Sequence, residues 1–321
     1  MKAAQITALG RIHLVDVPDL DTPRTGEVVV TAETGCLCGS DIPFFSEPQP
    51  AYPLPVGLSL HEIVGRVTQT SSAAFHVGDR VLAMPIGLRG CAERLQLGDD
   101  RLVAIDEAVS NETAVVSQPM ATVLSALRTI PSVAGLTAAV VGQGPIGLLF
   151  NACLSSLGAI RIIGIDARDA RVQRSCEFGA THTFVTRDGG RDAVTHVAEI
   201  TRGLMADLVV EAVGHQEQQF NLAAALARDH GRVLFFGIPP ERMDGIAFEA
   251  VVRKSLTVHT SVPDDLRPFV TLAQRAIAQG RIDPSRLITH RFPFANIQDA
   301  FETYRDRRDG ALKVLIDFRH L

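Results

Sequence analysis

The 321-residue chain is poor in cysteine and contains no long hydrophobic run. Its five cysteines are an odd number in a long chain, which argues against a secreted disulfide scaffold. No stretch approaches the ~18 consecutive apolar residues of a membrane span, and the N-terminal residues show no signal-peptide pattern. We therefore expect a soluble, cytoplasmic protein without a membrane partner.

Lysine is also scarce, since only Lys2, Lys254 and Lys313 occur among the 31 basic residues. The arginines are spread along the chain between 36 acidic residues, and the formal net charge is −5. No basic run or stripe of the kind that binds a phosphate backbone is present. Nucleic acid is therefore excluded as the expected partner.

The length suits two domains rather than one small core. Up to about residue 120, short strands are predicted at 12–17, 27–32, 63–68 and 80–83 between proline and glycine turns, which is typical of a β-sandwich or barrel. From about residue 136, continuous apolar strands alternate with helices, which predicts a parallel sheet covered on both faces. Periodicity leaves open whether the last segment joins the parallel sheet or returns to the first domain.

A glycine-rich turn follows the first strand of the predicted parallel sheet. Gly142, Gly144 and Gly147 form the pattern GxGxxG at the head of a helix, and Asp166 ends the next strand 19 residues later. Such a turn brings backbone close to a pyrophosphate at the helix N-terminus, and the acid binds the ribose hydroxyls. An acid here repels the 2′-phosphate of NADP, so NAD is the expected cofactor.

Further residues are expected around this dinucleotide. Arg171, in the following helix, either contacts a phosphate or lies in solvent. Later strands end at glycine-containing turns on the edge where such sheets bind ligands, although these glycines are equally consistent with simple turns. The predicted cofactor-binding residues are Gly142, Gly144, Pro145, Ile146, Gly147, Asp166, Arg171, Val213, Gly214 and Gly237.

Two segments of the β-rich part are rich in metal-ligating residue types. Cys38 lies in the run Gly-Cys-Leu-Cys-Gly-Ser-Asp, and His61 with Glu62 begins a run that ends at Gly65. Position 65 cannot ligate a metal, so this is not the HExxH pattern of a metalloprotease. A thiolate and an imidazole suit zinc. Taken alone, however, they favour a buried cysteine and a hydrogen-bonded histidine.

The order of these motifs, with Val-Gly-Asp-Arg-Val at 77–81 between them and the glycine-rich turn, resembles the zinc-containing medium-chain alcohol and polyol dehydrogenases. The resemblance implies an α/β protein with a GroES-like β-rich catalytic domain at 1–121 and 264–321. It implies a Rossmann domain, a doubly wound parallel sheet that binds NAD, at 122–263. Hydride transfer between a secondary alcohol or polyol and NAD, and a homodimer, are also implied.

The same resemblance implies the roles of individual residues. Cys38 and His61 are similar to catalytic zinc ligands, and Glu62 to the carboxylate that lies beside the metal or ligates it. Asp41 is similar to the acid that orients the ligand histidine, and Ser40 to the hydroxyl that takes the proton of the alcohol. Ser40 and Glu62 are the expected catalytic residues.

Three positions depart from the family pattern. Gln118 stands where relatives supply a further Cys, Asp or Glu ligand, so a neutral amide would complete the zinc site unless Glu62 ligates directly. Pro43 replaces a histidine that passes the proton to solvent, and a proline cannot do so. Leu60 replaces a glycine, which we expect to narrow the pocket. Phe44 and Phe45 are expected either to line that pocket or to be core aromatics.

The family's structural-zinc lobe, which carries four close cysteines, has no counterpart after residue 84, where Cys91 stands alone. One catalytic zinc and no structural zinc are therefore expected. Two alternatives stay open. One is a zinc-free, NAD(P)H-dependent quinone or enone reductase of the same superfamily, and the other is a non-catalytic nucleotide-binding relative.

Overall fold

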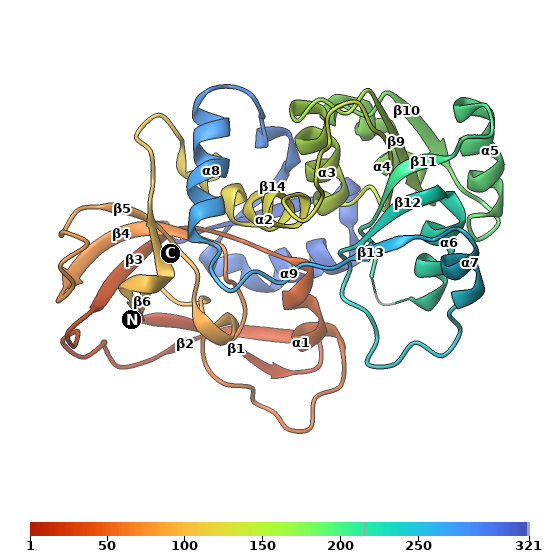
Figure 1. The fold of residues 1–321 in the computed structure, drawn as a ribbon. Helices are drawn as coiled ribbons and strands as arrows, with labels where there is room; N and C mark the ends of the chain where they lie inside the picture. Colours follow the sequence, from red (N-terminus) through yellow and green to blue (C-terminus); the bar gives the residue numbers. More distant parts are fainter. Residues whose placement is uncertain (215, 320–321) are drawn as a thin grey trace. The chain divides into compact units, whose positions relative to one another are not determined.

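The computed structural model describes residues 1–214 and 216–319, which divide into two compact units (Figure 1). Met1–Pro119 and the chain from Arg267 onward form the first unit, and Met120–Leu266 forms the second. No helix of the described residues is long and apolar enough to cross a membrane.

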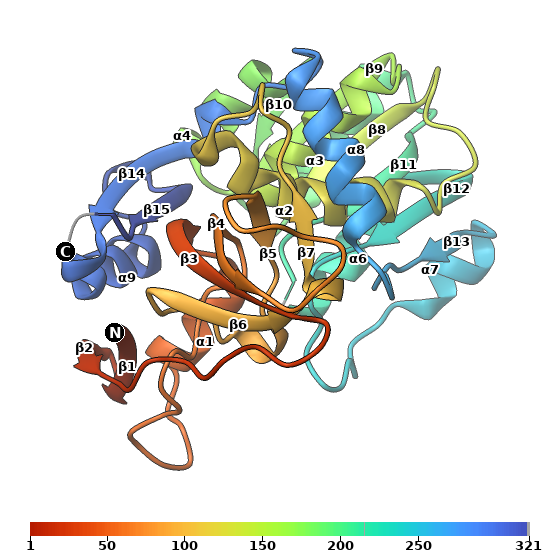
Figure 2. The same cartoon turned by 90° about the vertical axis from the view of Figure 1, so that its left-hand side faces the viewer.

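Most strands of the first unit join one sheet in the order β14-β15-β3-β4-β5-β7, and β6 pairs with β3. Figure 2 shows β3, β4, β5 and β7 following one another across this unit. Strands β1 and β2 form a separate antiparallel pair. The strands of the unit are β1 (Lys2–Ala8), β2 (Arg11–Asp16), β3 (Glu27–Cys36), β4 (Ile63–Thr70), β5 (Arg80–Ala83), β6 (Arg94–Gly98), β7 (Leu102–Ala104), β14 (Ile288–Pro293) and β15 (Lys313–Asp317). The helices assigned wholly to it are α1 (Ile42–Ser46), α8 (Arg267–Ala278) and α9 (Ile297–Asp306).

The chain's final segment returns to the first unit, which answers the question that periodicity left open. Strand β15 pairs antiparallel with β3, with Leu315 opposite Cys36. Helix α9 packs on β14 and β15 and contributes Phe301 to the core beside Phe45. The end of β3, which leads directly to Cys38, is thus fixed by residues from the far end of the chain.

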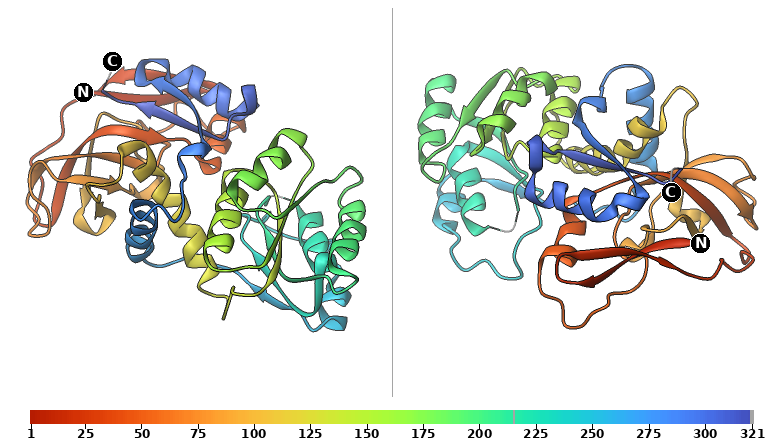
Figure 3. Two further views of the ribbon diagram at one scale, coloured as in Figure 1. Left: turned by 90° about the horizontal axis from the view of Figure 1, so that it is seen from above. Right: turned by 180° about the vertical axis from the view of Figure 1, so that it is seen from behind.

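The second unit is a parallel sheet in the order β10-β9-β8-β11-β12-β13. This is the strand order 3-2-1-4-5-6 of the doubly wound dinucleotide-binding fold, and it confirms the predicted fold class. Helices α3 and α4 cover one face of the sheet and α5 and α6 the other (Figure 3). The strands are β8 (Thr137–Val141), β9 (Arg161–Asp166), β10 (His182–Val185), β11 (Ala206–Glu211), β12 (Ala227–Phe235) and β13 (Thr257–His259). The helices are α3 (Pro145–Ser156), α4 (Asp169–Ser175), α5 (Arg191–Thr201), α6 (Glu217–Leu226) and α7 (Phe248–Arg253).

The expectation of an all-β first part is wrong at its end, where α2 (Asn111–Leu127) begins. Residues 114–121 of this helix are buried without exception, so no polar stripe marks a helical period. Pro119 lies inside the helix, at a position where proline normally signals a helix end. Because of these two features, the sequence of α2 lacks the usual helical pattern and does not predict a helix.

Candidate functional site

A buried carboxylate holds together the two segments that carry the predicted metal ligands. Asp41 belongs to a short 3-10 turn, Gly39–Asp41, just after the end of β3. Its Oδ2 accepts the N–H of Cys38 and its Oδ1 that of Leu60, each at 2.8 Å. Asp41 is fully buried, and burial raises the pKa of its carboxyl. The carboxylate therefore positions the backbone on both sides of the site, while its predicted role toward the ring of His61 stays a prediction.

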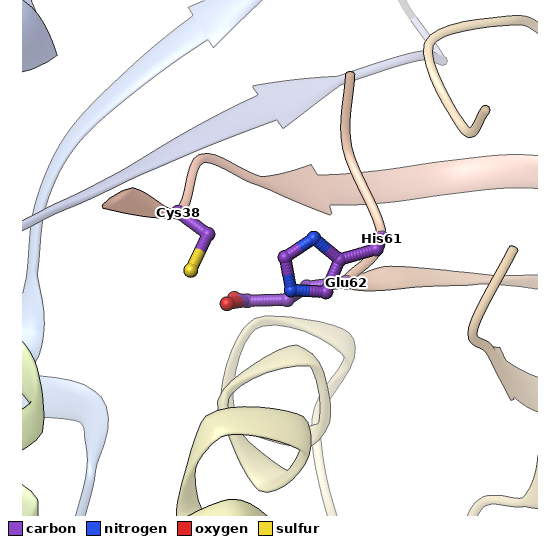
Figure 4. Close-up of side chains that lie close together, drawn as sticks. All are labelled: Cys38, His61 and Glu62. Carbon is purple, nitrogen blue, oxygen red and sulfur yellow. The ribbon is translucent and has the colours of Figure 1, made fainter. Parts of the chain in front are cut away.

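Cys38, His61 and Glu62 come together in the structure although 23 positions separate the first two in sequence. The ligand atoms of the three residues all lie within 4.8 Å of one another. Figure 4 shows the Cys38 sulfur and the Glu62 carboxylate pointing toward each other beside the His61 ring. The Nδ1 atom of His61 is buried and has no hydrogen-bond partner among the described residues. Sulfur, imidazole and carboxylate donors this close together fit a zinc ion.

The Ser40 hydroxyl lies in the same turn as Cys38. Its Oγ is buried and makes no hydrogen bond within the described part of the chain. A buried hydroxyl normally finds a partner, so Ser40 has an unused donor and acceptor for a ligand. Gln118 is 8% exposed and lies on α2 in the first unit. Its role as a metal ligand stays a prediction.

The structure reveals a partner of Glu62 that the sequence interpretation missed. The Lys313 Nζ lies 2.7 Å from each Glu62 carboxylate oxygen, and both side chains are buried. The pKa of Lys313 lies well above its ordinary value: burial alone would lower it, but the nearby acidic groups, Cys36 first and then Glu62, outweigh burial. Lys313 is the sole charged residue in the apolar run 311–316. A charged residue within such a run was the available signal.

Two positions discussed for the pocket lie in the core of the first unit. Leu60 is fully buried there, and its predicted effect on the pocket stays a prediction. Its φ of 66°, after 101° at Ser59, explains why a glycine suits this position, since bulky residues rarely adopt positive φ. Phe45 is a core aromatic, with its ring 5.2 Å from that of Phe301.

The glycine-rich turn joins β8 to α3 in the second unit. Gly142 has a φ of 92°, and a Cβ on Gly147 would lie 1.7 Å from the Gly142 carbonyl oxygen. Only glycine permits this close approach of helix and strand. Gly144 is the N-cap of α3 and Pro145 its first residue, with Ile146 next. The turn has the form that the dinucleotide pattern predicts.

Asp166, at the end of β9, lies beside this turn. Its carboxylate accepts the backbone N–H of Gln143 at 2.7 Å and of Arg168 at 2.9 Å. The Arg171 guanidinium lies 3.5 Å from the same carboxylate, and a Cβ on Gly144 would meet it at 3.6 Å. The predicted acid, arginine and glycine-rich turn therefore form one cluster.

A buried polar network behind the turn was also missed by the sequence interpretation. The Gln143 side chain is fully buried, and its Nε2 donates to the Val140 carbonyl at 2.8 Å. Its Oε1 accepts hydrogen bonds from Asn151 at 2.7 Å and Ser175 at 2.8 Å. Gln143 thereby ties the turn to α3 and α4.

Glu211, a further missed residue, organises the two later turns of the sheet. Its buried Oε1 accepts the N–H groups of Val213 and Gly214, both at 2.8 Å, and Oε2 accepts that of Gly237 at 3.2 Å. A Cβ on Gly237 would lie 2.3 Å from the Gly214 nitrogen. The predicted residues at the ends of β11 and β12 thus pack together. An acid at the end of an apolar strand was the signal for it.

Comparisons with known proteins agree with this geometry. The model of the alcohol dehydrogenase GroES-like domain matches residues 24–124, and that of the zinc-binding dehydrogenase matches residues 145–273. The chain is 24% identical to the L-threonine 3-dehydrogenase of Bacillus licheniformis, covering 94% of each chain. It is also 24% identical to the sorbitol dehydrogenase of Bacillus subtilis, covering 98% of this chain and 97% of that one.

A solved structure shares the fold. A protein described as a short chain alcohol dehydrogenase from E. coli CFT073, in complex with NADH, superimposes with a TM-score of 0.87 at 22% identity, and the match covers 99% of each chain. With the two matching family models, these comparisons confirm the resemblance that the motifs predicted. The chain belongs to the zinc-type medium-chain dehydrogenases.

Proposed function

We propose that the chain is an NAD-dependent dehydrogenase that acts on a secondary alcohol or polyol with the help of one zinc ion. The group of Cys38, His61 and Glu62 is the observation that carries the proposal, in a chain that also has the dinucleotide-binding strand order. The relatives named above are dehydrogenases of threonine and sorbitol, which supports a hydroxyl compound as the substrate class.

Cys38 and His61 would hold the zinc ion, with Gln118 as a further donor, and Glu62 would lie beside the ion or ligate it. The closeness of the three ligand atoms supports this assignment. Zinc, when bound, supplies a Lewis acid that lowers the pKa of a substrate hydroxyl. Cys91 is the single cysteine in the segment that follows residue 84 and cannot build a second, four-ligand site, which supports one zinc ion per chain.

Ser40 would accept the proton of the substrate hydroxyl, because its buried Oγ has no partner among the described residues. The neighbouring Pro43 has no group that could pass the proton on. Ser40 would therefore have to pass the proton to water, to a ribose hydroxyl of the cofactor or to another group. The carboxylate of Glu62 lies beside this site and is paired with Lys313.

The cofactor would bind along the carboxyl edge of the second unit's sheet. The N-terminus of α3, which begins at Gly144 and Pro145, offers N–H groups to the pyrophosphate. Asp166 would accept the ribose hydroxyls of NAD, and its negative charge disfavours the phosphate of NADP. The turns at Val213–Gly214 and Gly237 form the other part of this edge.

One experiment tests the function. Zinc is quantified on the purified protein, and NADH formation is then followed with a panel of secondary alcohols and polyols. We expect one zinc per chain, activity with at least one member of the panel, and loss of both in Cys38→Ala. Cys176→Ala, which removes an exposed thiol of the second unit, is the matched control.

The same experiment separates the alternatives. A zinc-free protein that oxidises NADPH with quinones or enones would be the reductase. The neutral side chain of Gln118, which is a weaker metal ligand than a carboxylate, supports this alternative. Tight NADH binding with no turnover of any substrate would identify a non-catalytic relative. Either result contradicts the proposed dehydrogenase.

We also propose the organisation of the molecule. The catalytic domain would comprise 1–121 and 264–321 and the NAD-binding domain 122–263, which the two compact units support.

A homodimer is supported by β13, an edge strand. Within the described chain β13 pairs with β12, and its Val258 is 40% exposed. The five free cysteines support a reducing, cytoplasmic location. Light scattering on the purified protein tests the dimer.

A further inference from the structure

The Lys313 ammonium makes a complete set of hydrogen bonds inside the first unit. It has three N–H donors, and it donates to Glu62 Oε1 and Oε2 at 2.7 Å each and to the Leu37 carbonyl at 3.2 Å. An ammonium can only donate, so the two equal contacts mark both oxygens of Glu62 as acceptors. This is the pattern of a lysine ammonium on an ionised carboxylate.

No solvent competes for this pair. The Lys313 side chain is 2% exposed and that of Glu62 is fully buried. Opposite charges attract strongly where water is excluded, and a buried charge that loses its partner is strongly destabilised. The carboxylate of Glu62 therefore already has a charged partner, Lys313, in the absence of a metal ion.

Lys313 also lies next to the metal-ligating segment through its backbone. It is the first residue of β15, and the next residue, Val314, accepts the N–H of Leu37 at 3.0 Å. Leu37 immediately precedes Cys38. Strand β15 thus binds the turn that carries Cys38 through a backbone hydrogen bond. Through the Lys313 side chain it also binds Glu62, the residue that follows His61.

We propose that Lys313 competes with the zinc ion for Glu62 and keeps this carboxylate out of the metal's ligand set. The inference rests on the proposed zinc dehydrogenase. A metal–carboxylate bond would require Glu62 to share an oxygen between two cations at close range. With Glu62 neutralised by Lys313, the ligand charge offered to zinc comes from Cys38 alone. Lys313 is thus a positioning residue that leaves the zinc site more positive and its affinity lower.

Competition with a chromophoric chelator measures zinc affinity in four proteins: wild type, Lys313→Met, Glu62→Gln and the double variant. Removing only the ammonium frees Glu62 to ligate, so we expect Lys313→Met to bind zinc at least tenfold more tightly. Removing only the carboxylate leaves an unpaired ammonium, which should weaken zinc binding at least tenfold. The double variant removes both charges and should match wild type within about threefold.

The order of the four affinities distinguishes this role from a merely structural one. If Glu62 already ligates zinc, the double variant will bind at least tenfold more weakly than wild type, and the inference is wrong. If Lys313 only supports the fold, Lys313→Met will weaken zinc binding, which also overturns it.

Circular dichroism controls for folding, and if Lys313→Met does not fold, the comparison of wild type with the double variant still decides. A wild-type protein that binds no zinc contradicts both this inference and the proposed function. A zinc-binding protein with a different order of affinities contradicts the inference alone.

Discussion

Replacing Glu211 with glutamine tests whether one buried carboxylate fixes the cofactor edge of the second unit. The carboxylate accepts N–H groups from Val213, Gly214 and Gly237. Glutamine has nearly the same shape, and its single oxygen can keep the two 2.8 Å bonds to Val213 and Gly214. Its NH2 group then faces the N–H of Gly237, so that two donors oppose each other.

The cost of this change follows from the contacts. A hydrogen bond to a charged acceptor contributes about 1.5–3 kcal/mol. The N–H of Gly237 keeps a second acceptor, the backbone carbonyl of Glu211 at 3.1 Å. We therefore expect Glu211→Gln to lower the free energy of unfolding by about 1.5–3 kcal/mol, because only the bond to the carboxylate is lost. A displacement of the turns costing about 1.4 kcal/mol would weaken NADH binding about tenfold.

NADH fluorescence titration and urea unfolding measure the two effects. Glu249→Gln is the matched control, because Glu249 is an exposed residue of α7 in the same unit whose ion pair with Arg253 lies on the surface. Such a pair contributes well under about 1 kcal/mol, so the control should behave as wild type. NADH affinity and unfolding free energy of Glu211→Gln equal to those of the control would refute the reasoning.

Three further predictions follow from other contacts. Gly147→Ala should abolish NADH binding in the same titration while zinc content persists, because its Cβ would lie 1.7 Å from a carbonyl oxygen; retained binding would contradict the predicted turn. Asp41→Asn keeps one acceptor oxygen but turns a donor toward the N–H of Cys38 or Leu60, so a chelator should remove zinc at least tenfold more readily, and an unchanged affinity would exclude this role. Burial raises the pKa of Cys153 to about 12, so its stabilising effect is complete below pH 9 and is lost as the pH rises toward 12, by about 1.4 kcal/mol per unit. In urea unfolding from pH 9 upward, the free energy of unfolding of Cys153→Ala should fall with pH less steeply than that of wild type by this amount. Equal slopes would show that this thiol does not contribute.

The parts predicted well from the sequence are those in which local pattern decides structure. Buried parallel strands are continuous apolar runs. The runs at 136–141 and 160–166 predict β8 and β9 with an error of one residue at their first positions. The glycine-rich turn was predictable because its chemistry lies within six residues. Cys38 and His61 were found through the motifs around them rather than through their separation.

The parts that could not be predicted depend on long-range pairing or on unusual backbone. Lys313 and Glu62 are 251 residues apart, and their contact requires the register of β15 on β3. The positive φ of Leu60 contradicts the preference of leucine, and the N–H bond to Asp41 helps to hold it. Neither leaves a periodic trace in the sequence.

The pairing of β15 with β3 has a consequence for biosynthesis. All strands of the second unit lie between residues 120 and 266, so its sheet can form while later residues are still being translated. The sheet of the first unit cannot be completed until β14 and β15 have been translated. Pairing between such distant segments is intrinsically slow. Cys38, His61 and Glu62 therefore leave the ribosome long before Lys313 does. In a newborn chain Glu62 therefore stays without its lysine until the last strand arrives, and that strand completes the group of buried side chains.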